Sequence, residues 1–310
     1  MLFLPYRIDL ELTKIPVFTI LICFACIFIY TKQYTKDQKH YESVQYFCTQ
    51  SLEKQEIALL RNISHQDVGN QCYEIFEGIR SAVEPQQKIA DLVKQAEPIG
   101  LFPNALDDYN YIHSRLSNMY QRYKSRVPDS LTENLAYDPK ELNLFKMVSS
   151  TFSHGSIPHL IGNLIFFFIF ASSVELIVGK ITYVGFIAVV SIGTSVAYSY
   201  SVRGLEAALP TVGLSGVVMA TIVALALMMP MVRIRCFFWF LVIFKVFRIP
   251  ALILAVWYVG WDLYEMNQAG DNSAINYVAH VSGAFMGALL GLYFLIFRKN
   301  HLREINSTVG

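Results

Sequence analysis

Long apolar runs constrain the fold of this chain more than any other feature. Six such runs are separated by polar connections, and about 20 apolar residues are enough for a helix to cross a bilayer. The runs cover residues 15–30, 158–178, 181–201, 211–230, 249–265 and 275–297. Charged residues make up only 16% of the chain, whereas an ordinary soluble domain contains about a quarter. We therefore predict an all-α polytopic membrane protein with a six-helix transmembrane core.

Residues 33–145 interrupt this pattern with a polar segment of helical periodicity. Three amphipathic stretches, at 37–63, 68–97 and 104–127, predict a soluble helical insert. The first apolar run has no small-residue cleavage site after it, so we expect an uncleaved membrane helix and not a signal peptide. The predicted parts are a lead with the first membrane helix, the insert, a membrane core with five further helices, and a tail. They cover residues 1–32, 33–145, 146–298 and 299–310.

Lysine and arginine are concentrated in alternate connections of the core, and such connections are typically cytoplasmic. Three lysines after the first run argue for the opposite orientation, but long loops cross the membrane largely regardless of charge. The basic side contains Lys180, Arg233, Arg235, Lys245, Arg248, Arg298, Lys299 and Arg303. Both termini and the tail are therefore predicted to be cytoplasmic, the insert extracytoplasmic, and the aromatic segment 236–247 interfacial. A bacterial inner membrane is the expected location, because no organelle-type targeting peptide is seen.

Two cysteines, Cys48 and Cys72, lie in the insert and could form a disulfide in an extracytoplasmic compartment. In a simple helical hairpin that turns near Gln66, however, they would stand at unequal distances from the turn. This geometry argues against the disulfide. The sequence leaves open whether the insert recruits substrates, gates access to the core or mediates homo-oligomer formation.

A serine between glycines opens the fourth apolar run, in the sequence Gly213-Leu214-Ser215-Gly216. Gly213 can adopt a turn that other residues do not tolerate, and Gly216 leaves room for a neighbouring backbone or a substrate. A small polar side chain between glycines packs a hydrophobic core poorly, so Ser215 is a candidate functional residue.

The predicted topology brings other polar side chains to the same depth as Ser215. The second, fourth and sixth helices all run inward from the extracytoplasmic face. His159 and Asn163 lie near the start of the second, and His280 lies near the start of the sixth. At about 1.5 Å per residue, all four side chains fall in one shallow layer.

These residue types match the needs of nucleophilic catalysis at a carbonyl. A serine hydroxyl is a weak nucleophile unless a base lies within hydrogen-bond reach, and His280 is the candidate base. The resulting oxyanion needs fixed donors, which His159, Asn163 and the backbone N–H of Ser215 could supply. Each residue also has a structural alternative: a histidine bonded within the core, an asparagine joining two helices, or a serine bonded to its own helix.

Glycines repeat every four residues on one face of the sixth run, at Gly283, Gly287 and Gly291. This spacing predicts close helix packing, which would draw His280 toward Ser215. Asp262 lies toward the outer end of the fifth run, but nothing in its spacing singles it out to orient the histidine. We therefore predict a Ser–His dyad.

Other chemistries lack their motifs. A zinc intramembrane protease needs His-Glu-x-x-His, which is absent. An aspartyl protease needs two membrane aspartates, and the apolar runs clearly offer only Asp262. Nucleotide-binding glycine loops and zinc-type cysteine pairs are also absent, and the net charge is only +1. No metal, cofactor or nucleic-acid partner is predicted. A transporter would be expected to show broken helices or internal repeats, and neither is seen.

The chain resembles the rhomboid family of intramembrane serine proteases over about residues 150–297. The matching motifs follow the family's order on alternate helices, and Glu175 near the end of the second run also fits. They are His154-Gly155-Ser156-Ile157-Pro158-His159-Leu160-Ile161-Gly162-Asn163, Gly213-Leu214-Ser215-Gly216 and Ala279-His280-Val281-Ser282-Gly283.

The resemblance implies a rhomboid-like six-helix core with the serine in a water-accessible cavity open to the extracytoplasmic side. It implies Ser215 as nucleophile, His280 as base, and His159 with Asn163 as oxyanion-hole donors. His154 is similar to a supporting histidine of the family. Substrates would be transmembrane proteins, cut in or near the outer part of a helix that unwinds locally in the lipid bilayer.

Two departures from the family pattern concern the surroundings of the site. Many relatives carry a Trp-Arg pair after the first span, whereas no Trp precedes Trp239 here. Many also have an aromatic residue four positions after the nucleophile, where this chain has Met219. The alternative function is a catalytically silent rhomboid-like protein that binds transmembrane clients without cleaving them. The presence of both Ser215 and His280 argues against it.

Overall fold

The computed structural model describes most of the chain. The described residues are 2–10, 14–64, 71–82, 84–204, 208–240, 243–268 and 275–307. They form two compact units, one of residues 1–33 and 131–310, the other of residues 34–130. The second unit therefore lies within the predicted insert, whose last part, 131–145, packs with the first unit.

The first unit holds one helix for each predicted apolar run. These helices are α1 (Val17–Tyr46), α8 (Ile157–Val178), α9 (Lys180–Ser201), α10 (Ser215–Met228), α11 (Ala251–Gln268) and α12 (Tyr277–Phe297). Among the described residues, four helical segments are long and apolar enough to cross a membrane, namely those containing α1, α8, α9 and α12. The shorter helices α6 (Leu131–Leu135), α7 (Leu144–Phe152) and α13 (Lys299–Ser307) complete the unit.

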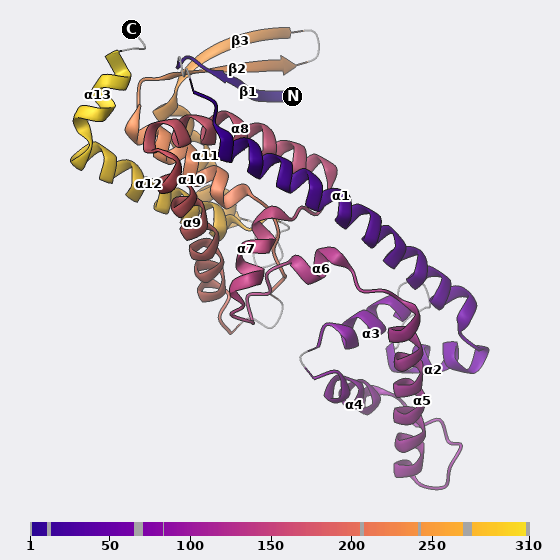
Figure 1. The fold of residues 1–310 in the computed structure, drawn as a ribbon. Helices are drawn as coiled ribbons and strands as arrows, with labels where there is room; N and C mark the ends of the chain where they lie inside the picture. Colours follow the sequence, from indigo (N-terminus) through magenta and orange to yellow (C-terminus); the bar gives the residue numbers. More distant parts are fainter. Residues whose placement is uncertain are drawn as a thin grey trace. The chain divides into compact units, whose positions relative to one another are not determined.

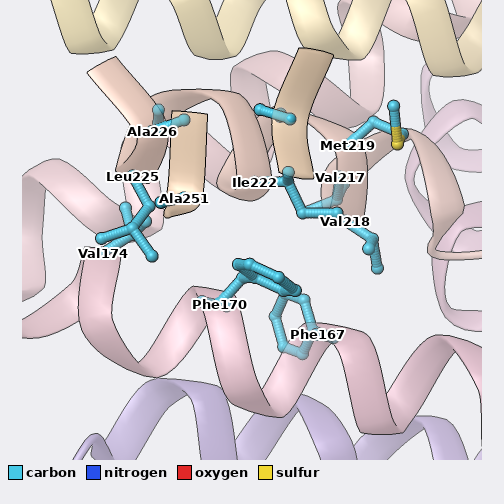
Figure 2. Packing of buried hydrophobic residues seen from close by; sticks show 14 of the residues in the cluster. Phe167, Phe170, Val174, Val217, Val218, Met219, Ile222, Leu225, Ala226 and Ala251 are labelled. Atoms are coloured by element: carbon cyan, nitrogen blue, oxygen red, sulfur yellow. The ribbon is translucent and has the colours of Figure 1, made fainter. Parts of the chain in front are cut away.

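Helix α10 is short and central. Its 14 residues span roughly 21 Å, less than the about 30 Å of a bilayer's hydrocarbon core. It contacts α8, α9, α11 and α12 (Figure 1). On the α8 side, Phe167 and Phe170 lie beneath Val218 and Ile222 (Figure 2). Because α10 is apolar on all sides and buried in protein, it need not span the bilayer itself.

Helices α10 and α12 pack backbone against backbone at two glycines of α12. A methyl group added at Gly283 would lie 2.1 Å from the carbonyl oxygen of Gly216, and one added at Gly287 would lie 2.1 Å from that of Ala220. Both distances are far below van der Waals contact, so neither position can carry a side chain without moving the helices apart. The packing predicted from the glycine spacing is confirmed.

The N-terminus of α1 is held by a buried carboxylate. Glu175 on α8 accepts hydrogen bonds from the backbone N–H of Phe18 and Thr19, at 3.0 and 2.7 Å, and from the Thr19 hydroxyl at 2.8 Å. A negative charge is favourable at a helix N-terminus because the first N–H groups have no helical partner. These bonds explain why an acidic side chain can lie buried near the end of an apolar helix.

A three-stranded antiparallel sheet was not predicted from the sequence. Its strands are β1 (Leu2–Ile8), β2 (Arg233–Phe240) and β3 (Ile243–Pro250), in the order β1-β2-β3 (Figure 1). The segment expected at the membrane interface is thus part of a β-hairpin. Ile234 and Cys236 alternate inward and are fully buried, while Arg235 faces outward and pairs with Asp9 at 2.5 Å. This alternation is typical of a strand with one buried face.

The second unit is a small helical domain, and the last part of α1, from Tyr34 onward, belongs to it. After α1 come a π-helical turn, η1 (Phe47–Ser51), and the helices α2 (Lys54–Ser64), α3 (Gln71–Arg80), α4 (Pro85–Gln95) and α5 (Ala105–Arg126). The amphipathic stretch predicted at 68–97 is two helices, because Pro85 starts a new one. Phe47, Phe76 and Tyr123 pack in its core.

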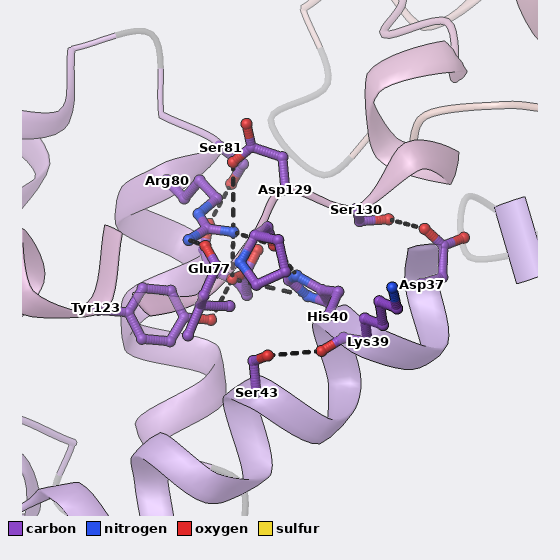
Figure 3. A network of polar contacts seen from close by, with 12 residues as sticks. Asp37, Lys39, His40, Ser43, Glu77, Arg80, Ser81, Tyr123, Asp129 and Ser130 are labelled. Carbon is purple, nitrogen blue, oxygen red and sulfur yellow. Dashed lines mark hydrogen bonds and ion pairs between the residues drawn. The ribbon is translucent and has the colours of Figure 1, made fainter. Parts of the chain in front are cut away.

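Buried polar groups of this unit bond to one another (Figure 3). Arg80 donates to the carbonyl oxygens of Val127 and Pro128, at 2.9 and 3.2 Å, and lies over the ring of Tyr123. The Tyr123 hydroxyl donates to Glu77, and the ring of His40 bonds Pro128 O at 2.7 Å. The network ties α1, α3 and the end of α5 together within the unit.

Cys48 and Cys72 form a disulfide, with a Cα–Cα distance of 5.8 Å. The expectation that they do not pair is therefore wrong. It assumed a turn near Gln66, which lies outside the described residues, whereas the chain already leaves helical geometry at Leu52. This earlier turn brings Cys48, in η1, beside the start of α3.

We expect the disulfide to stabilise the second unit by about 3 kcal/mol, because it closes a loop of 24 residues. Reductant should lower the unfolding temperature of this unit in the full-length protein. Limited proteolysis during heating measures this temperature. The Cys48→Ser/Cys72→Ser variant should start at the lower temperature and not respond to reductant. Equal unfolding of wild type with and without reductant would contradict this prediction.

Gly287→Ala should lower the stability of the detergent-solubilised protein by about 1–3 kcal/mol, because the added methyl group overpacks the contact with α10. Gly185→Ala is the matched control, since a methyl group at Gly185 meets nothing within 4 Å. Thermal unfolding measures both. If the two variants unfold at the same temperature, the contact is looser than described.

Candidate active site

The turn that precedes α10 is fixed by hydrogen bonds and by a glycine. The Gly213 N–H donates to Ser150 O on α7 at 2.8 Å, and Thr211 pairs with Tyr137 in an isolated antiparallel bridge. Gly213 has a φ of +130°, a conformation that L-residues with side chains rarely adopt. A methyl group there would also lie 2.8 Å from the ring of His159. Both observations explain the glycine.

Ser215 is the first residue of α10. The first backbone N–H groups of a helix have no helical partner and point toward its N-terminal end. Gly216 follows and packs against α12, where a methyl group would lie 3.0 Å from Ala279 O. The serine is therefore held beside the contact between α10 and α12.

His280 lies in the first turn of α12, on the helix face that Gly283 and Gly287 continue. The Asn276 side chain caps this helix by accepting from Ala279 N–H at 2.9 Å, and its amide donates to the Thr211 hydroxyl at 3.3 Å. The second bond joins the start of α12 to the turn before Ser215. The structure thus fixes the starts of both helices relative to each other.

His159 and Asn163 lie one turn apart at the start of α8. The Ser156 hydroxyl caps this helix and accepts from His159 N–H at 3.3 Å. The Asn163 amide nitrogen is buried, has no hydrogen-bond partner in the described part of the chain, and lies 3.6 Å from a methyl group built on Gly213. This donor is therefore free to bond a group that enters the site beside the serine turn.

These four side chains line one cavity of about 600 Å³. Ser215, His280, His159 and Asn163 all contribute to its wall, together with residues of α7, α9 and the turn before α10. The convergence predicted from helix topology is what the structure shows. The arrangement can present a hydroxyl, a base and several donors to one bound group.

His154 does not line this cavity. It is buried just before α8, and its ring packs edge-on against that of His159 at a centroid distance of 5.2 Å. The side chain of Gln33 holds its backbone, accepting from His154 N–H at 3.2 Å. His154 therefore supports His159 by packing.

Asp262 is the site residue that sequence reasoning did not select. Its carboxylate lies 3.0 Å from Nδ1 of His280, and both side chains are largely buried. An ionisable residue in an apolar run was a signal that could have found it, because such residues are costly in membranes. The sequence alone does not say which way Asp262 faces around its helix.

Met219 stands where the resemblance described above leads us to expect an aromatic residue, and it is buried in the core of the first unit. An aromatic contact to the histidine exists nevertheless. The ring of Tyr277 lies edge-on to that of His280 at 6.0 Å between centroids. His280 thus takes its aromatic neighbour from its own helix.

Comparison with known proteins gives one result that bears on this site. A family model described as the Rhomboid domain matches residues 141–297, just over half of the chain. Comparison with the curated proteins returned no match, and neither did comparison with the solved structures. The matched segment runs from α7 to α12 and contains every residue of the cavity wall named above.

Proposed function

Because the chain belongs to the rhomboid family, we propose that it is an intramembrane serine endopeptidase that hydrolyses peptide bonds in or near transmembrane helices. The observation that carries the proposal is the shared cavity of Ser215, His280, His159 and Asn163. Family membership makes the protein an integral membrane protein. The site residues make it a candidate protease.

In the proposed reaction, the Ser215 hydroxyl oxygen attacks the scissile carbonyl carbon while His280 takes the hydroxyl proton. The carbonyl oxygen becomes an oxyanion, which accepts hydrogen bonds from Asn163, His159 and the Ser215 N–H. The C–N bond then breaks, and His280 returns its proton to the leaving nitrogen. A water molecule attacks the acyl-enzyme in the same way and releases Ser215.

The substrate class follows from where the site lies. Ser215 begins a short apolar helix that contacts α8, α9, α11 and α12, so a scissile carbonyl must reach it between helices of the core. A peptide carbonyl in an intact helix is already hydrogen-bonded four residues along and shielded by side chains. We therefore propose that substrates are transmembrane proteins whose helix unwinds locally at the cut.

We propose that the cavity opens to the extracytoplasmic side of a bacterial inner membrane. The alternating basic connections support this orientation. The Cys48–Cys72 disulfide supports it independently, because disulfides persist in oxidising compartments and are rare in the cytosol. Both lines of support favour an insert, 33–145, outside the cytoplasm.

The competing proposal is a silent protein that binds transmembrane clients without cutting them. Nucleophilic catalysis needs a serine, a base and hydrogen-bond donors held at one place, whereas a binding role does not need this combination. The shared cavity and the Asn276–Thr211 bond, which ties the turn before Ser215 to the helix that carries His280, therefore favour the enzyme.

Cleavage of a transmembrane reporter by purified protein tests the proposal. Ser215→Ala and His280→Ala should each lower the rate by at least about 10³-fold, because nucleophile and base act as a unit. Ser191→Ala is the matched control, since Ser191 lies on α9 and donates to its own helix at Ile187 O. Cleavage that persists in Ser215→Ala, or folded wild type that cuts no reporter, would count against the enzyme.

Asn163→Ala should lower kcat by about 10²- to 10³-fold, because the lost donor acts on charge that forms only in the transition state. KM should change little for the same reason. Steady-state kinetics with the same reporter separates the two constants. A rise in KM at unchanged kcat would instead make Asn163 a substrate-binding residue.

A further inference from the structure

We propose that Asp262 is a positioning residue that orients His280 and turns the predicted dyad into a Ser–His–Asp triad. The inference rests on the proposed function, because it assigns His280 as the base. It departs from the sequence prediction, in which no acid served the histidine.

The geometry is that of an acid that holds an imidazole ring. Asp262 Oδ2 lies 3.0 Å from His280 Nδ1, and the two side chains are only 14% and 16% exposed. An ionised carboxylate can only accept a hydrogen bond, so the proton of this bond lies on Nδ1. The other ring nitrogen, Nε2, is then unprotonated and can accept the proton of Ser215.

The charge of Asp262 adds a second effect. When His280 takes the serine proton it becomes an imidazolium, and this cation forms beside a carboxylate that is largely shielded from solvent. A carboxylate at hydrogen-bond distance stabilises the cation far more there than it would in water. The effect is greatest when the imidazolium exists, so it should appear in kcat and not in KM.

The carboxylate also needs this partner. Ionisable side chains inside membrane proteins are costly and normally pair with another group. In the described part of the chain, Asp262 has its hydrogen bond and ion-pair contact with His280. Glu265, the next acidic residue of α11, offers the comparison, because no contact between it and His280 is found in the described residues.

A simpler reading is that the bond only fastens α11 to α12. In that case Asp262 would matter for stability, and its loss would be felt whether or not His280 is present. A positioning residue acts through the histidine, so its effect on catalysis should vanish when the histidine is removed. This difference makes the inference testable.

The first test compares Asp262→Asn, Asp262→Glu and Glu265→Gln in the reporter assay. We expect Asp262→Asn to lower kcat by about 10²-fold or more with KM nearly unchanged. Asp262→Glu should recover a large part of kcat because it restores the charge, and Glu265→Gln should equal wild type. Wild-type kcat in Asp262→Asn would overturn the inference while leaving Ser215-dependent cleavage, and with it the proposed function, intact.

The second test is a double-mutant cycle on the rate at which a fluorophosphonate labels Ser215. In the His280→Ala background, Asp262→Asn should slow labelling by less than about twofold, because the histidine it acts through is gone. A loss as large as that in the wild-type background would show that Asp262 acts independently of His280, and would overturn the inference.

The third test does not depend on activity. Nitrogen-15 NMR of labelled histidines reads which ring nitrogen carries the proton, and the His280→Ala spectrum identifies the signal. We expect His280 to be protonated at Nδ1 in wild type and to lose this preference in Asp262→Ala. An unchanged His280 signal in Asp262→Ala would overturn the inference even if the protein proves to be no protease.

Discussion

The close contact between α10 and α12 is the interaction on which the rest of the structure depends. Gly283 and Gly287 let the backbone of α12 approach the carbonyl oxygens of Gly216 and Ala220. Packing of small residues is the main force available between helices in a bilayer, where apolar burial gains little. Here this packing also sets the spacing between Ser215, which precedes Gly216, and His280, which lies one turn before Gly283. Stability and chemistry thus share one contact.

Buried polar groups divide the first unit into satisfied and unsatisfied sites. Glu175 is fully engaged by the start of α1, and Asp262 is engaged by His280. The Asn163 amide nitrogen is buried with no partner within the described residues. Among the described residues of this unit, both ring nitrogens of His154 and the Tyr258 hydroxyl also lack a protein partner, but neither residue lines the cavity of Ser215 as Asn163 does. Under the proposed function, the oxyanion accepts a hydrogen bond from the Asn163 donor.

The sequence was sufficient for the membrane helices and for the convergence of four side chains, because both depend only on hydropathy and on the direction of each helix. It was not sufficient for Asp262, since the rotation of α11 about its axis depends on tertiary packing. The sheet was missed because β1 and β2 are separated by more than 200 residues, so no local pattern indicates that they pair. The disulfide was missed because the turn at Leu52 follows a π-helical segment that no pattern announced.

The central claim is that Ser215 is an activated nucleophile within this cavity. Peptide mass spectrometry of the purified wild-type protein after reaction with a fluorophosphonate tests it most directly. The account predicts a single covalent adduct, located on Ser215 and formed at least about 10³-fold more slowly when His280 is replaced by alanine. A folded protein that forms no adduct, or forms one on a different serine, would contradict it.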